Sequence, residues 1–84
     1  MPNDIEATIE ERSKTHGDYK LVSKTSQHLK FIMRSGGSQS YRAAESLDMI
    51  AAKLARIIHG DANDPDHWLD IEGYSRLARM GLDE

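Results

Sequence analysis

The sequence lacks cysteine entirely, and aromatic residues make up only 6% of its 84 residues. The absence of cysteine excludes disulfides, thiol nucleophiles and cysteine-ligated zinc, and it favours a reducing compartment such as the cytoplasm. No apolar run approaches the roughly 18 residues that cross a bilayer, and no apolar stretch follows a basic start as in a signal peptide. We therefore expect a cytoplasmic protein with no membrane partner.

The chain has little net charge, −3 at pH 7, but the charge is unevenly placed. Residues 1–58 carry nine Lys and Arg against seven Asp and Glu, whereas residues 59–84 carry two against seven. The net negative charge argues against DNA as a partner. The basic excess over residues 12–34 could attract a polyanion, pair with an acidic segment in an oligomer, or simply be solvated. The cations of this stretch are Arg12, Lys14, Lys20, Lys24, Lys30 and Arg34.

The length fits one small domain, residues 1–84, whose core is thin enough that we expect an oligomer. Apolar residues recur at helical spacing in four segments, near 4–14, 19–34, 41–59 and 66–80, and strand patterns are nearly missing. Asp18, Ser38 or Ser40, and Asp64 before Pro65 are helix-start signals, and Gly17 and Gly60 are stop signals. The sequence predicts an all-α bundle of about four helices, with the hairpin of the last two packed on the first two.

The segment 19–34 has two different faces when it is drawn as a helix. Its basic side also carries Phe31, which lies away from the apolar residues. A basic face with an aromatic residue suits a partner chain, or a phosphate and a base, although an exposed Phe is also common without any function. The apolar side is predicted to hold Leu21, Val22, Leu29, Ile32 and Met33; the opposite side holds Lys20, Lys24, Lys30 and Arg34.

The segment 41–59 is predicted to bury a wide apolar face, beside a flank of small residues that would let another helix approach closely. The apolar face comprises Leu47, Ile50, Leu54, Ile57 and Ile58, and the flank comprises Ala44, Ala51, Ala52 and Ala55.

Two residues of the segment 66–80 are unexpected on its apolar arc, namely Asp70 and Gly73. A carboxylate on a packing face requires a partner, and an antiparallel hairpin brings Lys53 or Arg56 within reach. This pairing is either a structural salt bridge or part of a phosphate site in which Asp70 orients the cations. The glycine predicts close approach of another group.

Two groups of residues could hold a metal. Glu45 and Asp48, three positions apart on one helix, could together hold Mg²⁺, or they could be an ordinary solvated pair. A second group could bind a divalent cation, but helix capping and turn formation explain most of its members equally well. This second group is His59, Asp61, Asp64, Asp66 and His67. The chain has neither a phosphate-binding GxxxxGK[ST] loop nor a GxSxG nucleophile elbow.

Three stretches together resemble an uncharacterised family of short phage and prophage proteins. They are E-R-S-K-T-H-G-D over residues 11–18, A-E-S-L-D-M-I-A-A-K-L-A-R-I-I-H-G-D over 44–61, and D-H-W-L-D-I-E-G-Y over 66–74. The resemblance implies a phage accessory protein in the host cytoplasm that binds a host protein or a nucleotide-derived ligand without catalysis, as counter-defence proteins do. Combining its motifs with the basic face gives a set of candidate ligand-binding residues: Lys20, Lys24, Phe31, Lys53, Arg56, Asp70 and Tyr74.

A more distant resemblance is to the MazG-like all-α nucleoside triphosphate pyrophosphohydrolases. Glu45 and Asp48 match the E-x-x-D half of their Mg²⁺-binding signature. The other half, E-E-x-x-E, is matched only by Glu10 and Glu11, because Lys14 stands in the third acidic position. This resemblance implies an alternative function, a minimal Mg²⁺-dependent pyrophosphohydrolase in which Glu45 and Asp48 are catalytic. The binding function requires no cofactor.

Overall fold

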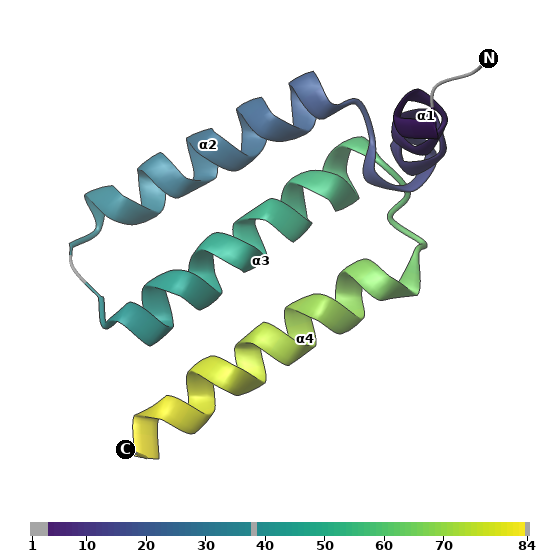
Figure 1. Cartoon of the computed structure of the whole chain (residues 1–84). Coiled ribbons are helices and arrows are strands. Elements are labelled where there is room, and N and C mark those ends of the chain that lie inside the picture. Colours follow the sequence, from purple (N-terminus) through teal and green to yellow (C-terminus); the bar gives the residue numbers. More distant parts are fainter. Residues whose placement is uncertain (1–3, 38, 84) are drawn as a thin grey trace.

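The computed structural model describes residues 4–37 and 39–83, and its architecture is the all-α bundle that the sequence predicts (Figure 1). The helices are α1 (Asp4–His16), α2 (Tyr19–Ser35), α3 (Tyr41–His59) and α4 (Pro65–Met80), followed by the short 3-10 helix η1 (Gly81–Asp83). The predicted boundaries differ from these by at most two residues. No strand is present within the described ranges.

Each of the last three long helices begins at a polar cap. The side chains of Asp18, Ser40 and Asp64 accept hydrogen bonds from backbone N–H groups in the first turns of α2, α3 and α4. Pro65 adds a preset backbone angle at the first position of α4. These caps satisfy donors that a helix start otherwise leaves without a partner, which explains why the helices begin at these residues.

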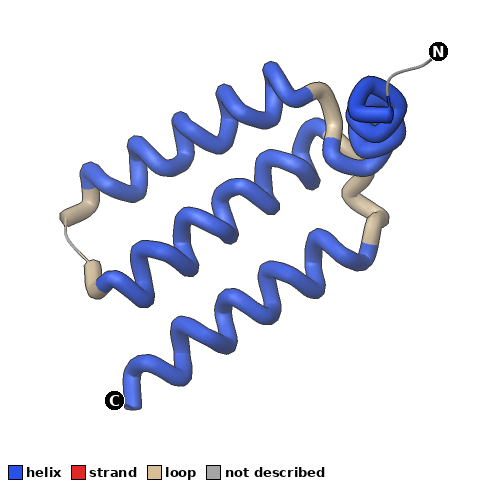
Figure 2. Tube along the Cα trace, in the orientation of Figure 1, coloured by secondary structure: helices blue, strands red, loops and turns tan. Residues whose placement is uncertain are grey.

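Helices α2, α3 and α4 lie side by side in one layer with α3 in the middle, and α1 lies at one end of this layer, where it is seen nearly end-on (Figures 1 and 2). The molecule is elongated, with dimensions of 51 × 24 × 23 Å. In a single layer, both faces are open to solvent wherever α1 does not cover them. This architecture therefore limits how much of each helix can be buried.

The most buried side chains of α3 are small rather than large. Ala51 and Ala55 are 1% and 0% exposed, and Ser46 is also buried. The prediction that the alanine flank allows close helix approach is confirmed. The prediction that the wide apolar face of α3 is buried is wrong for Leu54 and Ile58, which are exposed, whereas the other three residues of that face are partly buried. In α2, Val22 is buried as predicted, whereas Leu21 and Ile32 are exposed.

The α1–α2 turn packs directly against the turn that follows α3. The backbone N–H of Asp61 donates to the carbonyl oxygen of Thr15 at 2.9 Å. Gly17 has a φ of +85°, and a Cβ there would clash with the carbonyl oxygen of His59. A Cβ on Gly60 would clash with the carbonyl oxygen of Thr15. The two glycines are thus explained by a close backbone junction.

Gly73, in contrast, has no neighbour within 4 Å of where its Cβ would lie. The prediction that this mid-helix glycine marks the close approach of another group is wrong within the described chain. A glycine at such a position lowers helix stability, and no packing contact explains why glycine stands there.

Candidate functional site

A groove of about 620 Å³ lies where α1 meets α2 and α3. Its volume falls in the range of roughly 300–1,000 Å³ that is typical of small-molecule sites. None of the described residues that line the groove is acidic, and its polar side chains are cationic, hydroxyl or amide groups and the imidazole of His16. The residues that the argument uses are Arg12, Ser13 and His16 at the α1 end, Tyr19, Ser23, Gln27 and Lys30 from α2, and Arg56 from α3.

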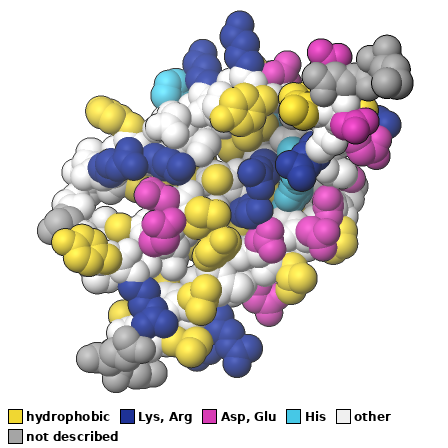
Figure 3. All heavy atoms as spheres, in the orientation of Figure 1, with side chains coloured by type: hydrophobic (Ala, Val, Ile, Leu, Met, Phe, Trp, Pro, Cys, Tyr) yellow, Lys and Arg dark blue, Asp and Glu magenta, His cyan; other side chains and the backbone are white. Residues whose placement is uncertain are grey.

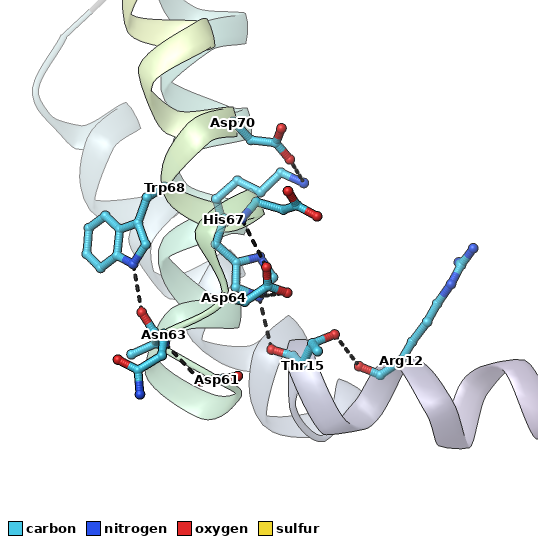
Figure 4. Close-up of polar contacts among 11 residues, drawn as sticks. Arg12, Thr15, Asp61, Asn63, Asp64, His67, Trp68 and Asp70 are labelled. Atoms are coloured by element: carbon cyan, nitrogen blue, oxygen red, sulfur yellow. Dashed lines mark hydrogen bonds and ion pairs between the residues drawn. The ribbon is translucent and has the colours of Figure 1, made fainter.

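Three cations of the groove, Arg12, Lys30 and Arg56, come from three different helices. Within the described part of the chain, no carboxylate lies within ion-pair distance of any of them. Figure 4 shows the Arg12 side chain extending away from the neighbouring polar contacts, and Figure 3 shows Lys and Arg side chains gathered beside a histidine on this face. Among the described residues, these three groove cations therefore have no ion-pair partner.

His16 reports this positive charge. Partial burial, followed by the nearby charge of Arg56, lowers its pKa below the ordinary value of 6.5, and Lys53 and Arg12 act in the same direction. The His16 ring lies 5.1 Å from the ring of His67, which also lowers the pKa. The part of this lowering of the pKa that Arg56, Lys53 and Arg12 cause comes from a positive potential, which also favours an anion.

Of the two cations that the sequence places within reach of Asp70, Lys53 forms the salt bridge, with 2.9 Å between Nζ and Oδ2. The Lys53 side chain is 13% exposed and that of Asp70 is 46% exposed. The hydrogen bond from Lys53, together with its charge, lowers the pKa of Asp70. The helical wheel predicts that Asp70 lies on a packing face. In the structure, Asp70 instead lies half-exposed at the edge of the α3–α4 contact.

Glu45 and Asp48 do not converge with a third ligand. Glu45 is exposed, and an Asp48 oxygen lies 3.9 Å from the Arg34 guanidinium. No group of three His, Asp or Glu side chains suited to a metal occurs within residues 4–37 and 39–83. Two carboxylates, one of them beside a guanidinium, do not fit the Mg²⁺ cage of the MazG-like enzymes, so we derive no catalytic step through a metal.

The predicted His and Asp metal cluster is used for local structure instead (Figure 4). His67, buried in α4, donates from Nε2 to the carbonyl oxygen of Thr15 at 3.0 Å. His59 hydrogen-bonds the Thr25 hydroxyl at 2.6 Å, and Asp64 caps α4. Asp61 accepts from the backbone N–H of Asn63 at 2.9 Å. The capping alternative accounts for these residues.

The remaining predicted ligand residues lie outside the groove. Lys20, Lys24 and Phe31 are exposed on α2, and none of them lines it. Tyr74 is half-buried on α4, away from the groove lining. Of the seven candidate ligand-binding residues, the structure therefore places only Arg56 in the groove.

Sequence reasoning did not single out Arg12 and His16 as site residues, and it placed Lys30 on the basic face of 19–34 without including it among the candidate ligand-binding residues. The excess of positive charge over residues 12–34 was the available signal. The helical wheel of α2 alone could not show that α1 closes a groove over one side of it.

A second hollow, of about 560 Å³, lies beside Trp68 at the start of α4. The indole N–H of Trp68 already donates to the carbonyl oxygen of Ala62 at 2.7 Å. The only charged residue in its lining is Glu72. This hollow therefore has fewer polar and charged groups for binding a ligand than the basic groove has.

Comparison with family models, curated proteins and solved structures finds no match to the chain. The resemblances to phage proteins and to the MazG-like enzymes thus stay predictions. In the part of the chain that the structure describes, none of the helices has both the length and the apolar character needed to span a bilayer.

Proposed function

We propose that the protein binds a phosphate-bearing ligand of the nucleotide type in the groove between α1, α2 and α3, without catalysing a reaction on it. The observation that carries the proposal is that Arg12, Lys30 and Arg56 line one groove, with no carboxylate of the described residues in ion-pair distance. Guanidinium groups suit phosphate oxygens because they donate two hydrogen bonds in a fixed planar geometry.

The rest of the groove supports a ligand larger than a simple anion. Tyr19 lines it with an exposed ring on which a base could stack. Ser13, Ser23 and Gln27 add neutral donors and acceptors that suit a sugar or a base edge. Their positions on two helices would fix the orientation of a ligand whose phosphates meet the cations.

The resemblance to phage and prophage proteins indicates what such binding would do in a cell. A non-catalytic binder of a nucleotide-derived signal would act in the cytoplasm of a bacterial host by withholding that signal from a defence system. Binding to a host protein through the same cations is the other form of this counter-defence function.

We also propose that the protein is a homo-oligomer. Within the described residues, the only buried hydrophobic residues are Val22, Ala51 and Ala55. So small a core supports association, because a chain of this size buries a limited share of its surface alone.

Calorimetric titration with ATP and with inorganic triphosphate, at constant ionic strength, tests the groove. We expect both probes to bind, and Arg56→Ala and Lys30→Ala each to weaken binding at least about tenfold, since charge-assisted hydrogen bonds contribute about 1.5–3 kcal/mol. Lys24→Ala is the matched control, because Lys24 lies on the same helix as Lys30 but outside the groove. Its affinity should equal that of the wild type.

Three results would contradict the proposal. An equal loss in Lys24→Ala would show that overall charge, rather than the groove, attracts the probes. Mg²⁺-dependent release of pyrophosphate that Asp48→Asn abolishes would favour the pyrophosphohydrolase alternative. Absence of binding by either probe, with the helical circular dichroism spectrum intact, would leave a host protein as the partner.

A further inference from the structure

The four histidines of the chain differ in what their rings contact. His67 is 2% exposed and its Nε2 hydrogen-bonds the carbonyl oxygen of Thr15, whereas Nε2 of His59 hydrogen-bonds a hydroxyl of α2. His28 is exposed on α2, outside the groove. His16 lines the groove, and no residue that the structure describes forms a hydrogen bond with its ring. Its ring nitrogens are therefore available to a ligand.

The His16 ring contacts the groove and is supported by a buried neighbour. Arg12 precedes His16 by four residues on α1, so both side chains lie on the same face of this helix, and both line the groove. The His67 ring, with its centroid 5.1 Å from that of His16, does not line the groove. Because the bond to Thr15 fixes the His67 ring, His67 holds the imidazole of His16 beside Arg12.

Basic side chains from four helices lie around His16 or line the same groove. They are Arg12 of α1, Lys30 of α2, Lys53 and Arg56 of α3, and His67 of α4. The other titratable group among the described lining residues is the phenol of Tyr19. A ligand that enters the groove therefore meets His16 among cations from several elements.

The nearby carboxylates have other partners. Asp70 lies 2.9 Å from the Lys53 ammonium, and Asp64 lies 4.0 Å from an imidazole of α4. Asp18 and Asp61, in the two adjoining turns, accept hydrogen bonds from backbone N–H groups close to them in sequence. None of these four carboxylates lines the groove. An anionic ligand would therefore bring the negative charge that the groove side of His16 lacks.

His16 is mainly neutral at pH 7 in the free protein. Partial burial, followed by the charge of Arg56, holds its pKa below 6.5. A phosphate in the groove would place negative charge beside the imidazole and offset the charges of Arg56 and Arg12, which favours the protonated form. Protonation also gives the ring an N–H on each nitrogen, so one more donor can face phosphate oxygens.

We infer that His16 binds a phosphate of the ligand as an imidazolium, so that binding takes up a proton. This inference rests on the proposed function of the groove and adds a dependence on pH to it. The proton comes from solvent and stays on the ring while the ligand is bound, and no covalent bond forms. The contribution of His16 to affinity should increase as the pH falls from about 8. It should level off below the pKa of the free protein, where the ring is protonated with or without ligand.

Calorimetric titration of the full chain with inorganic triphosphate, in two buffers of different ionisation enthalpy, measures the proton uptake. We expect the wild type to take up more protons than His16→Gln. Between about pH 8 and pH 5.5, its affinity should increase about tenfold more than that of His16→Gln, the effect of one added charge-assisted hydrogen bond. The triphosphate itself titrates in this range, and His16→Gln retains that contribution. His28→Gln is the matched control and should behave as the wild type, because His28 lies outside the groove.

Imidazole resonances in NMR spectra locate the proton, and those of His16 are identified by their absence in His16→Gln. Saturation with triphosphate should raise the pKa of His16 and leave that of His28 unchanged. Equal proton uptake by wild type and His16→Gln, with binding that Arg56→Ala still weakens, would overturn this inference and leave the proposed function standing. A rise in the pKa of His67 instead of His16 would also overturn it. Absence of triphosphate binding by the wild type would overturn both.

Discussion

At the scale of single residues, the Lys53–Asp70 pair shows how a half-exposed carboxylate can hold a mostly buried cation. The ammonium of Lys53 lies in the α3–α4 contact, where water cannot fully replace the carboxylate. Removal of the charge of Asp70 would leave this cation without its ion-pair partner. The energetic cost of that loss is larger when less water reaches the cation.

We expect Asp70→Asn to lower the melting temperature at neutral pH. Because the folded-state pKa of Asp70 is lowered from 3.8, the wild-type contribution is fully present above that pH and is lost as the pH falls through the lowered pKa. The two proteins should therefore differ at pH 7 and converge in acid, which thermal melts from pH 7 to pH 2 would measure. Glu72→Gln, an exposed position on the same helix, is the control. A constant difference down to the lowest pH would contradict this explanation.

At the scale of elements, α1 is held mainly at its end. None of its described residues is buried, whereas its last turn and the following Gly17 meet the turn after α3. The same end of α1 brings Arg12 and His16 to the groove. The junction between the two turns thus determines both how α1 is attached and whether the groove is closed.

A pair of glycine substitutions tests this junction. Gly17→Ala should lower the free energy of unfolding by at least about 1–2 kcal/mol, because the left-handed backbone at φ +85° disfavours a Cβ, which would also clash with His59. Gly73→Ala should raise it by roughly 0.5–1 kcal/mol, because its Cβ meets open space in a helix interior. Denaturant titration measures both. Equal effects of the same sign would show that helix propensity alone governs these sites.

At the scale of the whole molecule, the sequence predicted what depends on local chemistry. The helices and their starts at Asp18, Ser40 and Asp64 follow from apolar spacing and from side chains that bond the next few N–H groups. An ion pair of Asp70 with Lys53 or Arg56 was also predictable, because a short connection makes α3 and α4 antiparallel neighbours.

The features that the sequence did not predict depend on how the helices are arranged. A helical wheel assumes that the most apolar side is the buried one, but α3 lies in a single layer and buries Ala51 and Ala55 against its neighbours instead. The groove joins Arg12 to Arg56, and only the position of α1 at the end of the layer brings them together. No pattern within one segment specifies that position.

The junction between the two turns also has a consequence for the order of folding. The bond from His67 to Thr15 joins residues 52 positions apart, whereas α3 and α4 are joined by the short connection 60–64. Closing the longer loop has the larger entropic cost, so the α3–α4 hairpin should form before α1 docks. Gly17→Ala should then accelerate unfolding with little change in the folding rate, which stopped-flow kinetics would measure. A matching decrease in the folding rate would place the junction in the folding nucleus. With late docking, α1 would also be the first element to detach, so the groove would open while the three-helix layer remains folded.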